Sequence, residues 1–404
     1  MAARTLSETS LPFFLKRFFP HTPRENYRLV LMVFFFFMGI VFASWATRIP
    51  DIKRALDLSD AALGSILFAS PLGELCAIVP SAWIIGKIHS KKALLISMIL
   101  LPLCLVGLGL AFSKVTLFCA LFCFGFMYNM ANISVNSQAV GVEILYRRSI
   151  IATFHGMWSL GGVAGGVIGA LVAPLGLSPV LHFATICVLV LCGVFSLKSL
   201  IMPREVRIGK SRDSGHARPK FRPTPFLLIL GFIAFGSMAT EGAMYDWSSV
   251  FFAQVIQPGE HLVRVGYLAC MCFMVMGRLL ADGLVNRLGV TPVLQMSGLC
   301  IASGMSLALG FAELLPSTVG LALVGFGMAS VVPLCYSLAG KAKDIPAQVG
   351  ISFVSSISFF GFLACPPMVG FLSHLLNLRW ALSPIILVGA AIFVLAGLAG
   401  KMKQ

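Results

Sequence analysis

The stretch MPREVRIGKSRDSGHARPKFRPTP, residues 202–225, interrupts an apolar sequence near the middle of a 404-residue chain. It is rich in charged residues, Gly and Pro, a composition typical of a flexible linker. Six apolar runs precede this stretch and six follow it. We therefore predict two blocks of six helices joined by a linker.

Each apolar run approaches the roughly 20 residues that a helix needs to cross a bilayer. The predicted spans are 28–48, 61–86, 93–112, 115–140, 150–173, 180–202, 226–248, 264–285, 291–312, 317–340, 348–375 and 379–400. The chain is 58% hydrophobic and 11% charged, with a mean hydropathy of +0.94, which is far from the composition of soluble domains. These features predict an all-α membrane protein with twelve transmembrane helices.

The two blocks share residues at an offset near 200. The matching pairs are Gly125 with Gly325, Phe126 with Phe326, Ala139 with Ala339, Gly161 with Gly361 and Leu94 with Leu294. Parallel repeats of this kind build transporters whose substrate site lies between the halves, near the membrane midplane. The predicted division is an N-terminal segment (1–27), two pseudo-symmetric six-helix bundles (28–202 and 226–400), a linker (203–225) and a tail (401–404).

The net charge of +15 follows the membrane topology. Basic residues gather in alternate loops, and the intervening loops hold few, chiefly Lys53, Arg54, Lys114, Arg264 and Arg379. By the positive-inside rule, both termini are predicted to be cytoplasmic, in a bacterial inner membrane. No nucleic-acid partner is needed to explain this charge. The first 28 residues lack the apolar core of a removable signal peptide, so none is predicted.

One predicted helix carries an unusual number of amides, in FGFMYNMANISVNSQAVGVE, residues 124–143. An unpaired amide in lipid costs roughly 2 to 7 kcal/mol, so these side chains need partners. At 100° per residue, Asn129, Asn132, Asn136 and Glu143 fall within an arc of about 60°. This stripe either faces a polar cavity and binds solute hydroxyls, or bonds neighbouring helices. Gln138 lies on another face and is predicted to make a packing contact.

Ionisable residues inside spans are functional candidates because they are costly there. Glu74, Glu241 and His155 are candidates for proton coupling, and Tyr245 shares a helix face with Glu241. The alternatives are a neutral acid between helices for Glu74, an interhelical hydrogen bond for Glu241, and a simple hydrogen bond for His155. Asp246 is predicted to point elsewhere.

Two tryptophans are candidates for stacking on a solute ring, Trp158 and Trp45, although tryptophan also favours membrane interfaces. Arg48, at the end of the first span, is predicted to pair with Asp51, and the alternative is that it attracts an anionic solute. Elsewhere we predict no Lys or Arg in the middle of a span, which argues against a strongly anionic substrate.

Other features are assigned to packing or gating. Glu143 precedes Arg147 by one helical turn, and the pair is predicted to close one end of the protein. The run GGVAGGVIG places Gly161, Gly165 and Gly169 at a spacing of four, which lets helix backbones approach closely. The eleven Cys show no paired metal spacing and are predicted to be packing residues.

The sequence GRLLADGLVNRLG, with Gly277, Arg278, Asp282, Arg287 and Gly289, resembles the cytoplasmic loop signature of the major facilitator superfamily. The resemblance implies that Arg278, Asp282 and Arg287 act in gating. The equivalent loop of the first half, GKIHSKK, has no acid.

Four longer segments are similar to the YbjJ-type branch of that superfamily, which neighbours the fucose permease group. They are ASWATRIPDIKRALDLSDAALG (43–64), NISVNSQAVGVE (132–143), FHGMWSLGGVAGG (154–166) and EGAMYDWS (241–248). Fucose permease-like members tend to carry an acid where this chain has Asn132, so any proton-coupling acid is expected elsewhere.

Together these features predict a secondary active transporter that moves a small polar solute, such as a sugar or sugar derivative, by alternating access. We expect it to be proton-coupled and monomeric, with no cofactor, no metal and no enzymatic activity. The alternative is a lipid or amphiphile transporter on the same fold. A lateral apolar opening between the second and eleventh helices would favour that alternative.

Overall fold

The computed structural model describes residues 22–146, 150–203, 223–342 and 345–402. Within these ranges the regular elements are all helices. The first half holds α1 (Pro23–Ala55), α2 (Asp60–Leu67), α3 (Ala69–Gly109), α4 (Lys114–Tyr146), α5 (Ile151–Val172), α6 (Pro179–Leu197) and the short η2 (Lys198–Leu200). The second half holds α7 (Pro225–Phe251), η3 (Phe252–Ile256), α8 (Val265–Leu288), α9 (Val290–Phe311), α10 (Leu314–Met328), α11 (Val331–Ala339), α12 (Ala347–Leu375), α13 (Leu378–Ala381) and α14 (Pro384–Met402).

The described residues contain eleven apolar helical segments long enough to cross a membrane. One of them, Asp60–Gly109, has 50 residues and would be about 75 Å long if straight, more than twice the thickness of a bilayer core. Its backbone breaks at His89, where φ is 64° and ψ is 157°. Because this segment crosses twice, the eleven segments make twelve crossings, which confirms the predicted number.

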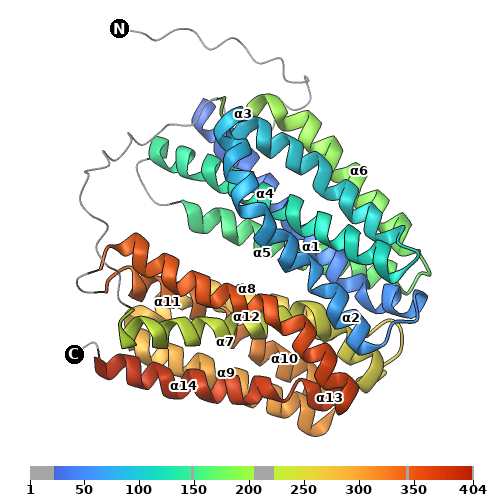
Figure 1. Cartoon of the computed structure of the whole chain (residues 1–404), viewed down its shortest axis with the longest axis vertical. Coiled ribbons are helices and arrows are strands. Elements are labelled where there is room, and N and C mark those ends of the chain that lie inside the picture. The colour runs from blue at the N-terminus through green and yellow to red at the C-terminus, as the bar shows by residue number, and fades with distance from the viewer. Residues whose placement is uncertain (1–21, 147–149, 204–222, 343–344, 403–404) are drawn as a thin grey trace.

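The helices gather in two groups, with α1–α6 in one and α7–α14 in the other (Figure 1). Corresponding helices make corresponding contacts. In the first group α1 packs against α5, and α3 packs against α4 and α6. In the second group α7 packs against α12, and α9 packs against α10 and α14.

The offset of 200 residues appears in the helix contacts themselves. A Cβ added to Gly125 would lie 2.0 Å from the carbonyl oxygen of Ser70, and one added to Gly325 would lie 2.1 Å from that of Cys270. His89 shares its left-handed backbone conformation with Gly289, where φ is 87° and ψ is 166°. Most of the predicted linker 203–225 lies outside the described residues, and α7 begins at Pro225, beside the predicted start.

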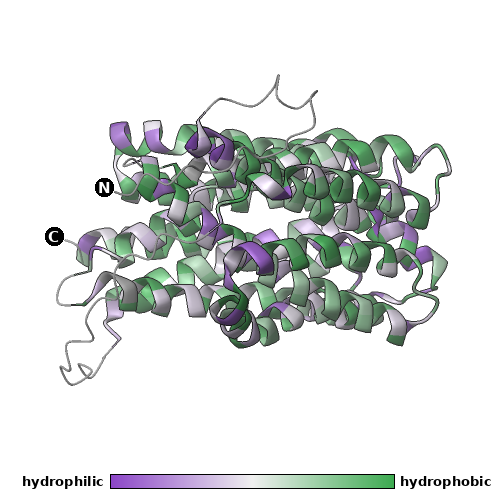
Figure 2. Ribbon diagram, turned by 90° about the horizontal axis from the view of Figure 1, so that it is seen from above, coloured by the Kyte–Doolittle hydropathy of each residue, from purple (hydrophilic) through white to green (hydrophobic). Residues whose placement is uncertain are grey.

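Loops alternate between two ends of the molecule. The end that carries loops 56–59 and 257–264 is called the Arg264 end, and it lies at the right of Figure 1. The end where α1 begins and α14 finishes is called the His155 end. Hydrophobic residues make up most of the helix length between these ends (Figure 2), and many large apolar side chains face outward, such as Val79 and Leu279, which are 78% and 77% exposed. Contact with lipid chains explains this exposure.

Candidate functional site

Aromatic rings from four helices meet where the two halves face each other. Phe42 of α1 lies at the middle of this group, with ring centroids 5.8 Å from Tyr128 of α4 and 6.2 Å from Trp158 of α5. Its centroid is also 5.1 Å from that of Tyr245 on α7, in an edge-to-face arrangement. Because α7 belongs to the second half, Phe42 joins aromatic side chains of both halves.

Polar side chains continue this group on the same helices. We define the central cluster as Phe42, Tyr128, Trp158, Ser159, Glu241, Tyr245 and Arg278. The Tyr245 hydroxyl donates to Glu241 Oε1 at 2.5 Å, and Trp158 Nε1 donates to the Tyr128 hydroxyl at 2.6 Å. The cluster is thus a set of rings in tilted and edge-to-face contact, with hydrogen-bonding groups on both sides of the interface.

Arg278 of α8 joins the two halves within this cluster. Its Nη1 donates to Ser159 Oγ at 2.7 Å, and its Nη2 lies 3.5 Å from Glu241 Oε1. Its guanidinium also lies over the Trp158 ring, 5.9 Å from the centroid. The expectation that no cation lies in the middle of a span is therefore wrong at this position, because Arg278 sits well inside α8.

The other predicted gating residues of α8 lie elsewhere. Asp282 and Arg287 are exposed toward the end of α8 that reaches Leu288. Arg278 contacts Glu241 and Ser159 instead. The loop signature thus covers residues in two environments, and its gating role remains a prediction for Asp282 and Arg287.

The asparagine stripe runs along α4 from the central cluster toward the His155 end. Asn132 is exposed and Asn136 is half-buried. Asn136 Nδ2 donates at 2.8 Å to both the side-chain and the main-chain oxygen of Asn132. Among the described residues, the hydrogen bonds of these two amides stay within α4. Tyr128, one turn before Asn132, connects the stripe to the cluster.

Of the remaining amides of α4, Asn129 is half-buried and Gln138 is buried. Asn129 Oδ1 has no partner among the described groups. Gln138 Nε2 donates to Ser90 Oγ at 2.7 Å and to the Met202 carbonyl at 3.3 Å, which confirms the predicted packing contact. Gln138 therefore bonds other segments, whereas Asn132 does not.

His155 lies on α5 and Glu74 on α3, and neither is one of the seven residues of the central cluster. His155 of α5 is exposed, and its carbonyl accepts the Ser159 hydroxyl at 3.2 Å. Ser159, one turn after His155, is the residue that Arg278 bonds. Glu74 of α3 and Asp246 of α7 are both half-buried. Neither Glu74 nor Asp246 belongs to the hydrogen bonds of the central cluster, and the proton-coupling roles of Glu74 and His155 remain predictions.

Trp45 follows Phe42 by three residues on α1. It is 3% exposed and packs in the apolar core. Within the described residues, the ring contacts that join Phe42 to the cluster do not include Trp45. The stacking role predicted for two tryptophans has geometric support at Trp158.

At the Arg264 end, buried charges join the halves. Arg264, 1% exposed, donates from Nε to the Thr47 carbonyl at 2.9 Å and from Nη2 to Asp51 Oδ2 at 2.6 Å. The same carboxylate oxygen accepts Arg48 Nη1 at 2.9 Å, which confirms the predicted Arg48–Asp51 pair. Arg48 also donates to the Leu177 carbonyl. Two arginines from different halves therefore share one carboxylate.

A second carboxylate repeats this arrangement at the same end. Asp60 accepts Lys53 Nζ at 2.8 Å, Gln254 Nε2 at 3.3 Å and the hydroxyl of Ser373. We call the groups around Asp51 and Asp60 the ionic seal. Arg54 and Glu260 add an exposed pair at 3.0 Å.

Sequence reasoning missed most of the ionic seal. Arg264 and Asp51 are 213 residues apart, so neither periodicity nor local spacing could connect them. The sequence did hold one indication. Five basic residues lie in loops that the positive-inside rule expects to be poor in Lys and Arg, and local bonding partners would explain their presence there. Four of those five bond acidic or carbonyl groups, namely Lys53, Arg54, Arg264 and Arg379.

The second and eleventh crossings meet by backbone contact at the Arg264 end. A Cβ added to Gly64 of α2 would lie 2.5 Å from the Pro366 carbonyl oxygen and 2.8 Å from the Gly370 Cα, both on α12. At this depth no side chain separates the two helices. The lateral opening expected for a lipid transporter is therefore closed at this position.

The glycines of α5 form two packing faces. Added Cβ atoms on Gly161 and Gly165 would lie 2.1 Å and 2.7 Å from carbonyl oxygens of α1, which confirms the predicted close approach. Gly162 and Gly166 face α8 of the other half, where Met271 Cε and Leu268 Cδ2 lie 3.0 Å and 2.8 Å from their added Cβ atoms. One helix thus makes close contacts both within its half and across the interface.

Glu143 has a capping role. Its Oε2 accepts the backbone N–H groups of Ile150 and Ile151, at 2.9 Å and 3.2 Å, at the start of α5. This arrangement satisfies donors that a helix N-terminus leaves free. Arg147, its predicted partner, lies outside the described residues.

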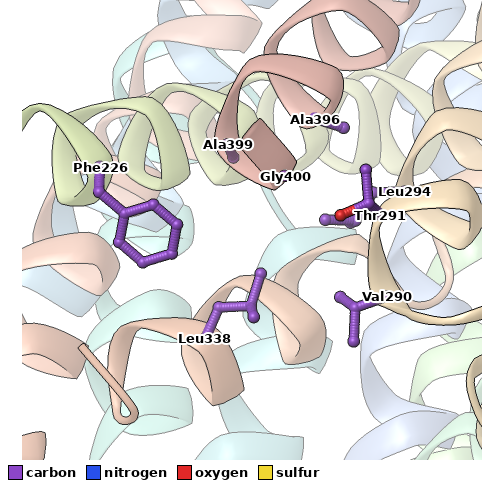
Figure 3. Close-up of a pocket in the computed structure, with 8 residues that line it drawn as sticks. All are labelled: Phe226, Val290, Thr291, Leu294, Leu338, Ala396, Ala399 and Gly400. Carbon is purple, nitrogen blue, oxygen red and sulfur yellow. The ribbon is translucent and has the colours of Figure 1, made fainter. Parts of the chain in front are cut away.

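A cavity of about 100 Å³ lies within the second half, away from the central cluster (Figure 3). Its lining residues are Phe226, Val290, Thr291, Leu294, Leu338, Ala396, Ala399 and Gly400. Only Thr291 among these eight has a polar side chain, so the cavity offers little to a polar solute.

Comparison with known proteins identifies the family. The sequence profile of the Major Facilitator Superfamily matches residues 29–349. The chain belongs to this superfamily. It is 32% identical over 359 residues to an uncharacterized MFS-type transporter of Yersinia pestis, covering 88% of this chain and 91% of that protein. It is 30% identical over 378 residues to membrane protein MosC of Rhizobium meliloti, covering 92% and 90%.

Solved structures share the fold. The nucleoside transporter NupG superposes with a TM-score of 0.73 at 12% identity, covering 94% of this chain and 100% of that one. A D-xylose-proton symporter superposes with a TM-score of 0.71 at 14% identity, covering 93% and 96%. The protein is therefore a multi-pass membrane transporter of the major facilitator superfamily, and proteins of this fold move small molecules and are not enzymes.

Proposed function

We propose that this protein is a secondary active transporter that moves a small polar, hydroxyl-rich solute across the bacterial inner membrane by alternating access. A sugar or sugar derivative fits best. Two proteins that share its fold are named as a nucleoside transporter and a D-xylose-proton symporter, and both of those solutes contain a sugar ring. The solute would bind at the central cluster.

The observation that carries this proposal is the composition of the central cluster. Phe42 and Trp158 of the first half lie against Tyr245 and Arg278 of the second half. A solute bound here touches both halves at once, so its binding free energy can differ between the two conformations, as alternating access requires. Aromatic rings stack on sugar rings, and the amides of Asn132 and Asn136 supply both donors and acceptors for hydroxyls.

The arrangement of charges supports one orientation of the protein in the membrane and one state of the transport cycle. The positive-inside rule assigns the His155 end, with both termini, to the cytoplasm. The ionic seal closes the opposite end, while Asn132 and His155 are exposed. We therefore assign this structure to the inward-facing state.

Two finer assignments belong to the same proposal. The segments quoted above support membership of the YbjJ-type branch, beside the fucose permease group. Glu241, bonded to Arg278 and Tyr245 in the cluster, is the leading candidate for proton coupling, followed by His155 and Glu74. We expect a monomer to suffice, because the whole cluster comes from one chain.

Transport by the purified protein in liposomes tests this proposal. A panel of labelled neutral sugars, sugar acids, sugar amines and nucleosides is offered with and without an inward proton gradient. We expect saturable uptake of at least one solute, reduced several-fold by Asn132→Ala or Asn136→Ala. Absence of uptake across the panel, or uptake that ignores both substitutions, would contradict the proposed site.

A further inference from the structure

The guanidinium of Arg278 is more exposed and held by longer contacts than that of Arg264, near the start of the same helix. Arg264 makes bonds of 2.6 Å and 2.9 Å, and its side chain is 2% exposed. Arg278 has one short bond, to Ser159, and a 3.5 Å contact with Glu241, and its side chain is 32% exposed. A guanidinium has five N–H donors, so most of those on Arg278 remain available.

Placing an arginine in the middle of a transmembrane helix costs free energy, so such a residue is expected to contribute to stability or function. A purely structural role would favour the short bonds and deep burial of Arg264. The remaining N–H donors of Arg278 instead belong to a side chain that is partly exposed. They are suited to an acceptor that arrives from solution.

We propose that the transported solute carries a carboxylate, and that this carboxylate binds Arg278 in place of Glu241. The inference rests on the function proposed above and narrows its substrate class to hydroxylated monocarboxylates, such as sugar acids. Guanidinium and carboxylate form two parallel hydrogen bonds, a geometry that the single 3.5 Å contact with Glu241 does not provide.

The balance of charge in the central cluster identifies Glu241 as the residue that takes up the coupled proton. Before binding, Arg278 and Glu241 together are neutral. When a solute carboxylate occupies Arg278, one proton from solution binds the Glu241 carboxylate, which keeps its hydrogen bond with Tyr245. The loaded cluster is then also neutral, so each carboxylate crosses with one proton and no net charge. No covalent bond forms or breaks apart from this proton transfer.

Other charged solutes fit the cluster less well. A phosphate dianion would need a second cation, and Arg278 is the one Lys or Arg among the seven residues of the central cluster. An ammonium group would be held beside the Arg278 guanidinium and repelled by it. The charge of the Glu241 carboxylate, which could attract such a group, is already matched by Arg278.

The test compares solutes that differ in one functional group. Binding of D-gluconate and D-glucuronate to the detergent-purified full chain is measured by titration calorimetry against D-glucitol and D-glucose, and uptake is measured in liposomes. Arg278→Gln removes the cation, Arg278→Lys retains the charge, and Glu241→Gln mimics the protonated acid. Lys114→Gln, which alters an exposed lysine at the start of α4, is the control.

We expect the acids to bind at least tenfold more tightly than their neutral partners. Arg278→Gln should weaken acid binding by roughly 10- to 100-fold, as expected for losing hydrogen bonds to a charged group. Arg278→Lys should recover part of it. Glu241→Gln should bind the acid without pH dependence while abolishing proton uptake. Size-exclusion profiles matching the wild type exclude misfolding.

The two proposals fail differently. Neutral sugars or nucleosides transported as well as the acids, with a ratio that Arg278→Gln leaves unchanged, would overturn the carboxylate inference and leave the proposed function intact. Failure of every solute to bind and to cross would overturn both.

Discussion

The two ends of the interface between the halves differ in how their polar groups are satisfied. At the Arg264 end, Asp51 accepts two arginines and Asp60 accepts three donors, and these groups are largely buried. At the His155 end, Asn132 and His155 are exposed. The closed end is thus the one whose carboxylates are paired with cations, and the open end is the one whose amide and imidazole are exposed to water or solute.

Among the substitutions considered, one that breaks the ionic seal should open the Arg264 end the most. Arg264→Ala leaves Asp51 with one of its two arginines, and removing one partner of a buried pair costs about 3 to 5 kcal/mol. The sealed state should lose population, with faster hydrogen–deuterium exchange in residues 47–60 and 254–264. Unchanged exchange in both segments would show that the ionic seal does not hold this end closed.

Adding a methyl group between α5 and α8 should oppose the sealed state less strongly. In Gly166→Ala the new Cβ would lie 2.8 Å from Leu268 Cδ2, and overpacking of this kind costs about 1 to 3 kcal/mol. Exchange at the Arg264 end should rise, by less than in Arg264→Ala. Gly156→Ala on the same helix is the matched control, because no atom lies within 4 Å of its added Cβ. Equal changes in exchange for Gly166→Ala and Gly156→Ala would show that the added methyl group does not force α5 and α8 apart.

Two amides on one helix can separate access from packing. Asn132→Ala removes an exposed side chain and should lower uptake by about one order of magnitude, the loss of a typical hydrogen bond, with little change in thermal stability. Gln138→Ala removes a buried side chain bonded to Ser90 and Met202, and should lower the unfolding temperature instead. The opposite pattern would mean that Asn132 is structural.

Removing the exposed Arg54–Glu260 pair should change hydrogen exchange and uptake the least. The side chains of Arg54 and Glu260 are 64% and 56% exposed, and such pairs contribute about 0 to 1 kcal/mol. Arg54→Gln should leave exchange and uptake within error of the wild type. A large effect would show that surface charge, as well as the buried carboxylates, closes the Arg264 end.

Features carried by local sequence were predictable. Span length and hydropathy located twelve crossings, and even the double crossing within Asp60–Gly109 was separated correctly, because polar residues around His89 interrupt the apolar run. The glycine spacing in α5 predicted the close approach to α1, since that contact depends on the absence of side chains on one helix face.

Features that depend on two distant segments were not predictable. The pairing of Asp51 with Arg264 follows from how the halves dock, which no local pattern encodes. The position of Arg278 inside a span was missed because a short signature grouped it with Asp282 and Arg287, although it lies further inside α8 and contacts the other half; its gating role remains a prediction. Its neighbour Glu241 was identified because an isolated acid in an apolar span stands out by composition.

The glycine faces of α5 have a consequence for the motion itself. Where α5 meets α8, Gly162 and Gly166 carry no side chains, so Met271 and Leu268 of α8 lie directly against the backbone of α5. The free energy that favours one orientation of the halves must then come largely from polar contacts, such as the Arg278–Ser159 hydrogen bond between these helices and the ionic seal at the far end. A bound solute that changes those contacts can therefore shift the balance between the two orientations.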